Sequence, residues 1–250
     1  MIRVDNLSKS FGDKKVLDNV NLNINRGETF LIIGRSGAGK TVLLKSIVGL
    51  VRPDSGGIFI NGKDLTTFKK NQLNTIRENI GIVFQGNALF DFLTVGENVG
   101  FFLYQNSKLP HLTIKEKVNQ TLTLVGLEGT EELYPYELSG GMKKRVAVAR
   151  AIIYKPQIII YDEPTTGVDP IAVDKIVSLI EDLHNRFSIT SIIVTHDLHV
   201  GLKLADRLAF LLGGKIIFEG SKRELSELKD ERIMQFMRGS AEGPIKETEV

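Results

Sequence analysis

The sequence predicts an α/β protein, because a strand, a glycine-rich loop and a helix follow one another near its beginning. Thr29–Ile33 is a compact apolar run, Gly34–Thr41 contains three glycines, and residues 42–48 have the apolar spacing of a helix. Gln157–Tyr161 and Ser191–Thr195 are dense apolar runs, the pattern of strands in a sheet covered on both faces. Helical segments fall between these strands, which is the arrangement of the α/β class.

The remaining strands follow in order along the chain. The first, second and fourth of the segments below alternate apolar and polar residues, as strands with one buried face do, whereas the last four are continuously apolar. The expected strands are Ile2–Leu7, Val20–Ile24, Thr29–Ile33, Gly57–Ile60, Ile80–Phe84, Gln157–Tyr161, Ser191–Thr195, Arg207–Leu212 and Lys215–Phe218. Asn61-Gly62 marks a tight turn, and Gly213-Gly214 joins two strands as a hairpin.

The middle of the chain is expected to be helical. Residues 89–138 have helical spacing and no convincing strand, which indicates a helical insertion. The segment from Thr113 to Glu116 has the form of a capping box that opens a helix. Ser139 is placed to cap a second helix that runs to about Tyr154.

Composition excludes several classes of function. The chain has 250 residues, 42% of them hydrophobic, which is enough for a sizeable core. Thirty-two basic and thirty acidic residues leave a formal charge of +2, which gives no electrostatic reason to expect a nucleic-acid partner. The short clusters at 14–15, 69–70 and 143–145 are interpreted as solvated faces. Without cysteine, a disulfide framework, cysteine-ligated zinc and thiol catalysis are excluded.

No segment is expected to enter a membrane by itself. Residues 1–18 are interrupted by charges and do not resemble a signal peptide, so export is not expected. No stretch approaches the roughly 18 uncharged apolar residues that a spanning helix needs. After Leu228 the chain turns polar, and residues 239–250 are expected to be extended or disordered unless a partner orders them.

The loop Gly34–Thr41 reads Gly-Arg-Ser-Gly-Ala-Gly-Lys-Thr and matches the pattern G-x-x-x-x-G-K-[ST], which wraps nucleotide phosphates. Its backbone N–H groups can form an anion-binding nest at a helix N-terminus, and glycines permit close approach. Lys40 would reach the β- and γ-phosphates of ATP or GTP, and Thr41 would be a ligand of Mg²⁺. A glycine-rich turn can also simply join a strand to a helix.

Two consecutive carboxylates end the apolar segment Ile158–Tyr161. Asp162 and Glu163 lie at the carboxyl end of a strand, where α/β sheets bind their ligands. Asp162 suits the Mg²⁺ shell, commonly through water, and Glu163 could polarise or deprotonate an attacking water. An exposed acidic strand end would be the simpler interpretation without the glycine-rich loop.

Leu138-Ser139-Gly140-Gly141-Met142 resembles the LSGGQ signature of ATP-binding cassette (ABC) ATPases. Ser139 and the N–H groups of the two glycines would form a second anion site for a γ-phosphate. The resemblance implies that this site closes over the glycine-rich loop of a second copy, so two chains arranged head to tail would bind two ATP molecules. Met142 departs from the usual glutamine, which removes an amide donor but leaves the serine and glycines.

Other matches follow in the order of that family, over about residues 2 to 225. Phe11 resembles the aromatic that stacks on adenine, Gln85 the Q-loop glutamine, Asp169 the D-loop aspartate and His196 the switch histidine. Each match is weak alone, since Phe11 could belong to the core and a lone histidine is usually structural. The implied site comprises Glu163, His196 and Gln85 for catalysis, Thr41, Gln85 and Asp162 for Mg²⁺, and Phe11, Gly34, Arg35, Ser36, Gly37, Ala38, Gly39, Lys40, Thr41, Ser139, Gly140, Gly141 and Asp169 for ATP.

The resemblance also implies an architecture. It is a P-loop NTPase fold of the ABC ATPase type, with a mixed-sheet RecA-like core, an antiparallel β subdomain and a helical subdomain. Residues 1–238 would form one domain, with a helical subdomain of about 89–155 inserted in the core. Residues 239–250 would be a tail that can wrap the partner ATPase.

The residues that depart from the general ABC pattern resemble those of one subfamily, the ATPases of Mla-type, MCE-associated phospholipid transporters. They include Arg35 and Val42 around the phosphate-wrapping loop, the segment 85–95, Met142, and the stretch 232–244. This likeness implies an ATPase that is peripheral on the cytoplasmic face of the inner membrane. Its implied partners are a permease pair, an MCE substrate-binding protein and a STAS-domain regulator. The permease would dock on apolar residues that follow Gln85, namely Leu89, Phe90, Phe92 and Leu93, unless these belong to the core.

Two alternatives from other classes remain. One is an ATPase of an assembly or repair machine, for example for iron-sulfur clusters, and the other is an ATP-dependent translation factor. The latter usually carries two cassettes in a chain, whereas this sequence has one phosphate-wrapping loop and one signature. Neighbouring genes for a permease and an MCE protein would favour lipid transport, and iron-sulfur assembly genes would favour an assembly role.

Overall fold

The computed structural model describes residues 1–245, which form two compact units. The first unit combines Met1–Arg77 with the described residues from Thr190 onward, and the second comprises Glu78–Ile189. Within the described residues, no helix is both long enough and apolar enough to cross a membrane.

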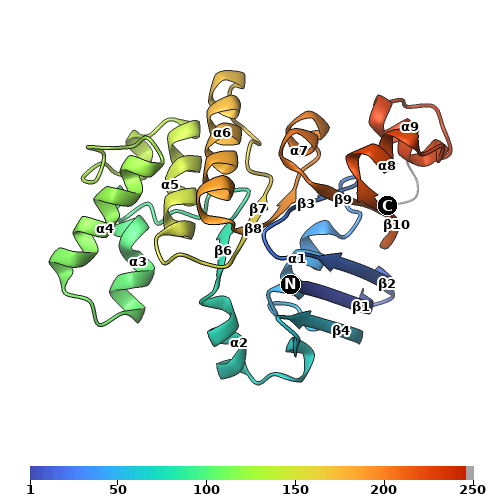
Figure 1. Cartoon of the computed structure of the whole chain (residues 1–250), viewed down its shortest axis with the longest axis horizontal. Coiled ribbons are helices and arrows are strands. Elements are labelled where there is room, and N and C mark those ends of the chain that lie inside the picture. The colour runs from blue at the N-terminus through green and yellow to red at the C-terminus, as the bar shows by residue number, and fades with distance from the viewer. Residues whose placement is uncertain (246–250) are drawn as a thin grey trace. The chain divides into compact units, whose positions relative to one another are not determined.

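The first unit contains an antiparallel sheet and a group of mostly parallel strands. The antiparallel sheet has the order β2-β1-β4-β5, and Figure 1 shows β2, β1 and β4 side by side. In the other group, β3 is central and pairs in parallel with β8 and β9, while β10 pairs antiparallel with β9. The strands are β1 (Ile2–Phe11), β2 (Lys14–Ile24), β3 (Thr29–Ile33), β4 (Ser55–Ile60), β5 (Lys63–Asp64), β8 (Thr190–Val194), β9 (Arg207–Leu212) and β10 (Lys215–Ser221).

The helices of the first unit connect or follow these strands. All five residues of β3 and all five of β8 are buried, which explains their unbroken apolar sequences. The helices are α1 (Lys40–Ile47), the 3-10 helix η1 (Leu65–Thr67), α2 (Lys70–Arg77), α7 (Leu198–Leu204), α8 (Lys222–Glu227) and α9 (Glu231–Arg238).

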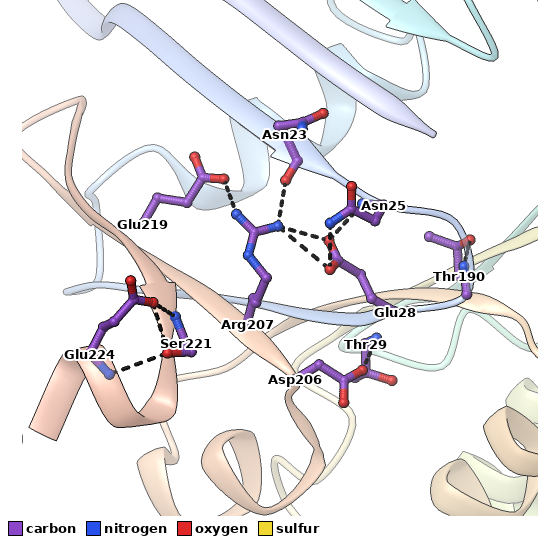
Figure 2. Close-up of polar contacts among 11 residues, drawn as sticks. Asn23, Asn25, Glu28, Thr29, Thr190, Asp206, Arg207, Glu219, Ser221 and Glu224 are labelled. Atoms are coloured by element: carbon purple, nitrogen blue, oxygen red, sulfur yellow. Dashed lines mark hydrogen bonds and ion pairs between the residues drawn. The ribbon is translucent and has the colours of Figure 1, made fainter.

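Arg207 joins four segments of the first unit (Figure 2). Its guanidinium donates to Glu28 at 3.2 Å, to Glu219 at 2.6 Å and to the carbonyl of Asn23 at 3.1 Å. The same group lies 5.5 Å from the centre of the Phe30 ring. Asn23 lies on β2, Glu28 lies in the turn before β3, Phe30 lies on β3 and Glu219 lies on β10. The network therefore fixes β3 relative to the antiparallel sheet.

The second unit contains two parallel strands and a helical segment between them in sequence. Strands β6 (Ile80–Val83) and β7 (Ile158–Asp162) pair from Ile80 opposite Ile158 to Val83 opposite Tyr161. Residues 84–157, all of them described, contain helices and no strand, so the predicted helical insertion is confirmed (Figure 1). The helices are α3 (Val95–Asn106), α4 (His111–Leu124), the 3-10 helix η2 (Pro135–Glu137), α5 (Gly140–Ile152) and α6 (Pro170–Phe187).

The predicted turns are confirmed, and one predicted helix start is wrong. Asn61 and Gly62 both have positive φ between β4 and β5, and Gly213-Gly214 joins β9 to β10. The helix expected from Thr113 begins at His111, directly after Pro110. Because Thr113 already lies in the first helical turn, it cannot act as the N-cap.

The first two strands are longer than the sequence predicts. The register of β1 shifts after Val4, Leu7 and Lys9, and Asn6 and Asn19 have positive φ. Such bulges interrupt the alternation of apolar and polar residues, so the pattern breaks down while the strands continue. The hairpin therefore extends to Phe11 at its tip.

The expectation of an extended tail is wrong for residues 240–245. The backbone N–H of Ile245 donates to Oε1 of Gln235 at 2.7 Å, and Nε2 of Gln235 donates to the carbonyl of Ile245 at 3.2 Å. Ile245 is buried. The buried amide of Gln235 therefore holds this part of the tail against α9, and the rest of the predicted tail, 246–250, lies outside the described residues.

Candidate functional site

The loop Gly34–Thr41, called the phosphate loop below, connects buried β3 to α1 in the first unit. The N-cap of α1 is Gly39, and within residues 1–245 no side chain caps this helix end. Its first turn also carries no acidic residue. The helix N-terminus therefore offers N–H donors and partial positive charge to an anion.

Two glycines of the phosphate loop are required by close contacts. A Cβ atom at Gly34 would collide with the carbonyl oxygen of Leu211. A Cβ atom at Gly39 would lie 2.8 Å from the carbonyl oxygen of Val16, and Gly39 has φ +101°. The backbone at these positions can reach its place only without a side chain.

Lys40 is buried and folds back over the phosphate loop. Its Nζ donates to the carbonyl of Gly34 at 2.7 Å and to the carbonyl of Arg35 at 2.9 Å. The cation is therefore held inside the curve of the loop, where it can contact phosphate oxygens. Thr41 is exposed beside it, with a hydroxyl that suits Mg²⁺. The loop is therefore suited to bind a nucleoside triphosphate together with Mg²⁺.

His196 lies close to the phosphate loop. It follows β8, and a cavity of about 390 Å³ is lined by Gly34, Arg35 and Ser36 together with His196. Other walls of this cavity come from α9 and the tail, including Gln235 and Ile245. The structure thus brings the predicted switch histidine next to the predicted phosphate site.

Phe11 lies at the tip of the β1–β2 hairpin and is 51% exposed, so it is not a core residue. The Nζ of Lys9 lies 5.3 Å from the centre of its ring. Residues Lys14–Val16 of the same hairpin line a cavity of about 130 Å³ together with the phosphate-loop residues Arg35–Ala38. An exposed aromatic ring on this hairpin is suited to stacking against a planar base.

In the second unit, Asp162 ends β7 and Glu163 follows it. Glu163 is 8% exposed, and its carboxylate accepts a hydrogen bond from the hydroxyl of Thr166 at 3.2 Å. Glu163 has φ +52°, a left-handed conformation that is strained for a residue with a Cβ atom. A strained backbone at the end of a buried strand is characteristic of functional positions.

Gln85 lies two residues beyond β6, with an exposed side chain. Its backbone carbonyl accepts a 2.6 Å hydrogen bond from Nζ of Lys144, which also donates to the carbonyl of Glu163 at 3.2 Å. The sequence interpretation of residues 143–145 as a solvated cluster is wrong for Lys144, which is 2% exposed. Three consecutive basic residues on a helix do not by themselves show that one of them points inward.

Ser139 caps α5 as predicted, accepting a hydrogen bond from the N–H of Met142 at 3.3 Å. Ser139 and Gly140 are exposed, so their hydroxyl and N–H groups face solvent. A Cβ atom at Gly141 would lie 2.8 Å from Cβ of Ala172 on α6. The glycine therefore permits close packing of α5 against α6.

Asp169 is the N-cap of α6. Its Oδ1 accepts hydrogen bonds from the N–H groups of Ile171 at 3.1 Å and Ala172 at 3.0 Å. Asp169 is exposed. A capping role accounts for its contacts within one chain.

The predicted site residues thus fall into two groups, each within one compact unit. The first unit brings together the phosphate loop and His196, with Phe11 on the neighbouring hairpin. The second unit holds the carboxylates, Gln85, the signature segment and Asp169. Lys144 belongs to this second group and is the residue that the sequence interpretation missed.

The family model for the ABC transporter family matches residues 17–166 of this chain. The chain is 40% identical over 246 residues to the intermembrane phospholipid transport system ATP-binding protein MlaF of Haemophilus influenzae, covering 98% of this chain and 93% of MlaF. It is 37% identical to the probable ribonucleotide transport ATP-binding protein mkl of Mycobacterium tuberculosis, covering 98% and 68%.

A solved structure has the same fold. The dimeric, post-hydrolysis ATP-binding cassette MJ0796, bound to ADP and Pi, superposes with a TM-score of 0.81 at 33% identity and covers 88% of this chain and 98% of its own. Because the family model covers more than half of the sequence, this chain belongs to the ABC transporter family. It is an ABC ATPase that binds ATP, with the α/β cassette fold that the sequence predicts.

Proposed function

We propose that this ATPase powers phospholipid transport between membranes through a separate permease and an MCE substrate-binding protein. The observation that carries the proposal is the 40% identity to MlaF across nearly the whole of both chains. The relative named for ribonucleotide transport is less similar and is covered over a smaller part of its length. An iron-sulfur assembly role receives no support from these relatives, whose names describe transport.

The proposed ATP contacts follow from the geometry of the first unit. Backbone N–H groups of the phosphate loop and the buried cation of Lys40 would hold the phosphates. Phe11 would stack on adenine, and His196 would contact the γ-phosphate. Arg35 and Ser36 line the same cavity as His196 and complete this side of the site.

Thr41, Gln85 and Asp162 would hold Mg²⁺, which neutralises charge on the phosphates when it is bound. Hydroxyl, amide and carboxylate oxygens are the ligand types that this ion prefers. Glu163 would accept a proton from the attacking water or orient it for in-line attack. Thr166 fixes one oxygen of that carboxylate, which limits its rotation.

We propose that two copies of the chain bind head to tail with ATP between them. The exposed Ser139 and Gly140, with the N–H of Gly141, would contact the γ-phosphate held by the phosphate loop of the other copy. Asp169 would lie in this interface. Each bound ATP would then join two chains, and hydrolysis would separate them again.

A permease surface is proposed on the loop that follows Gln85. Leu89, Phe90 and Leu93 are half-buried and Phe92 is 77% exposed, so this segment is not ordinary core. The ring of Phe90 lies 5.7 Å from that of Phe92 and 4.8 Å from that of Phe101. An exposed aromatic cluster of this kind suits an apolar helix of a membrane partner.

We further propose that residues 1–238 act as one cassette, with about 89–155 as its helical subdomain. A tail of residues 239–250 that wraps a partner ATPase would have to leave α9 and break the hydrogen bonds between Gln235 and Ile245. The assembly would hold the ATPase at the cytoplasmic face of the inner membrane as a peripheral subunit. A STAS-domain protein is the candidate for an additional regulatory subunit.

The proposal is tested by purifying the tagged chain together with its membrane partners and identifying the bound cargo by mass spectrometry. We expect a permease, an MCE protein and phospholipid, and an ATPase rate that increases in the complex. Recovery of a nucleotide cargo, or of iron-sulfur assembly proteins in place of a permease, would contradict the proposal.

A further inference from the structure

Lys144 is a buried cation that contacts two loops of the second unit. It lies in the second turn of α5, five residues after the N-cap Ser139. Its side chain reaches the carbonyl of Gln85 at 2.6 Å and the carbonyl of Glu163 at 3.2 Å. A buried ammonium is costly unless its N–H groups are paired, so these two carbonyls are what make this position tolerable.

The two loops follow neighbouring parallel strands. Gln85 comes shortly after β6 and Glu163 directly after β7, which pair from residue 80 opposite 158 onward. Both carbonyls therefore lie at the carboxyl edge of the strands. Lys144 hydrogen-bonds to both loops, whereas the Thr166 hydroxyl donates to the Glu163 carboxylate.

The contact with Glu163 acts on a strained backbone. Glu163 has a left-handed φ of +52° and precedes Pro164, which further restricts its conformation. The direction of the carbonyl and the direction of the side chain are coupled through this backbone. A donor fixed on the carbonyl therefore helps to fix where the carboxylate points.

The loop of residues 85–88, called the Gln85 loop, is also strained and is held by α5 at further points. Asn87 and Ala88 have φ +62° and +50°, and their carbonyls accept hydrogen bonds from Arg150 at 2.7 Å and 2.6 Å. Among the buried side-chain nitrogen and oxygen atoms of residues 1–245, Oδ1 of Asn87 is the one without a hydrogen-bond partner. Side chains of α5 therefore hold the Gln85 loop at three of its backbone carbonyls.

The electrostatics of Lys144 agree with this placement. Burial lowers the pKa of its amine, while the nearby carboxylates of Asp162 and Glu163 act in the opposite direction and favour the charged form. The cation therefore lies in the field of the carboxylates that are proposed to act on Mg²⁺ and water.

We propose that Lys144 is a positioning residue that couples the Gln85 loop to Glu163, so that the catalytic carboxylate is aligned only when that loop is in place. This inference rests on the proposed catalytic role of Glu163. Lys144 does not touch the substrate in this scheme. It acts through the two backbone carbonyls, and displacement of the Gln85 loop by a membrane partner would move Glu163 through the same side chain.

The test compares Lys144→Met, which keeps the length but removes the donors, with Lys144→Gln, which keeps an N–H donor. The matched control is Lys143→Met, which removes a neighbouring cation that is only half-buried on the same helix. For each variant, kcat and the Kd for ATP are measured and normalised to the amount of protein that binds ATP. This normalisation removes the effect of any unfolded fraction.

We expect Lys144→Met to lower kcat by about 10- to 100-fold, because small displacements of catalytic groups have effects of this size. The Kd for ATP should change less than about twofold, since the phosphate loop is intact, and Lys144→Gln should recover part of the rate. Lys143→Met should match the wild type. A wild-type kcat in Lys144→Met, or equal losses in kcat and ATP affinity, would overturn the proposal.

A double variant separates positioning from a general structural effect. In single-turnover experiments, adding Lys144→Met to Glu163→Gln should slow the residual reaction much less than it slows the wild type, because the carboxylate to be positioned is gone. Equal slowing in both backgrounds would refute the coupling. If the wild type hydrolyses ATP and Glu163→Gln does so much more slowly, the proposed catalytic role of Glu163 stands whatever Lys144 does.

Discussion

At the scale of single residues, two lysines of the cassette are buried and both donate to backbone carbonyls. Lys40 curves over the phosphate loop, and Lys144 joins the Gln85 loop to the residue after β7. Such cations remain charged inside a protein only when they are fully paired or when an anion approaches them. Lys40 lies at the proposed phosphate site, and Lys144 contacts the backbone of Glu163, whose carboxylate we propose acts on the attacking water.

Replacement of Glu163 by glutamine tests the role of that carboxylate. The amide has nearly the same shape but cannot accept a proton from water, so kcat should fall at least about 100-fold while ATP still binds. Steady-state hydrolysis and equilibrium binding of labelled ATP measure the two effects. Glu128→Gln, an exposed change in the same unit, should leave both unchanged. Wild-type turnover in Glu163→Gln would exclude the assigned role.

The sequence identifies Lys40 because its motif has a fixed spacing, and Ser139 because a serine before a helical run is a common N-cap. It does not identify Lys144, since the neighbouring residues 143 and 145 are also cations and only tertiary packing decides which of them is buried. The left-handed backbone of Glu163 was equally unpredictable, because no glycine or asparagine marks it.

At the scale of elements, helix starts depend on context as well as on capping patterns. The box predicted at Thr113 does not form because Pro110 begins the helix earlier. Real capping boxes occur at Thr94 with Glu97 and at Ser221 with Glu224. The same four-residue pattern is therefore informative only where the preceding residues leave the serine or threonine outside the helix.

The loop before α3 is shaped by one buried side chain. Nδ2 of Asn98 donates to the carbonyls of Phe90 at 3.0 Å, Leu93 at 3.1 Å and Thr94 at 3.0 Å, and its Oδ1 accepts from the N–H of Phe90 at 2.8 Å. These bonds hold the backbone of the segment while the ring of Phe92 stays exposed. The loop can therefore expose the ring of Phe92 while its backbone polar groups remain hydrogen-bonded to Asn98.

Phe92→Asp should remove stimulation of the ATPase by the permease without altering ATP binding or basal hydrolysis. The reason is that a charge opposes burial of this surface against an apolar partner, whereas the exposed ring contributes little to the fold. The ATPase rate is measured with and without reconstituted permease. Leu112→Asp, at a position on α4 that is 70% exposed, is the matched control. Retained stimulation in Phe92→Asp would exclude this docking surface.

At the scale of the whole molecule, the α/β class, the main strands and the helical insertion were predictable because buried strands and helices have distinct periods. The division into two compact units required the structure. The folded tail also required it, since residues 240–245 are polar or small except for Ile245 and offer no periodic signal.

In the proposed dimer, the phosphate loop of one copy and the signature of the other bind the same ATP. The most direct test is the mass of Glu163→Gln in solution, measured by light scattering with and without ATP. We expect a monomer without ATP and a dimer with it. Adding Ser139→Asp should keep the helix cap and ATP binding but prevent the dimer, because its carboxylate would repel the γ-phosphate. The proposed dimer would be contradicted if Glu163→Gln binds ATP and stays monomeric. It would also be contradicted if the Glu163→Gln protein with Ser139→Asp added dimerises equally well.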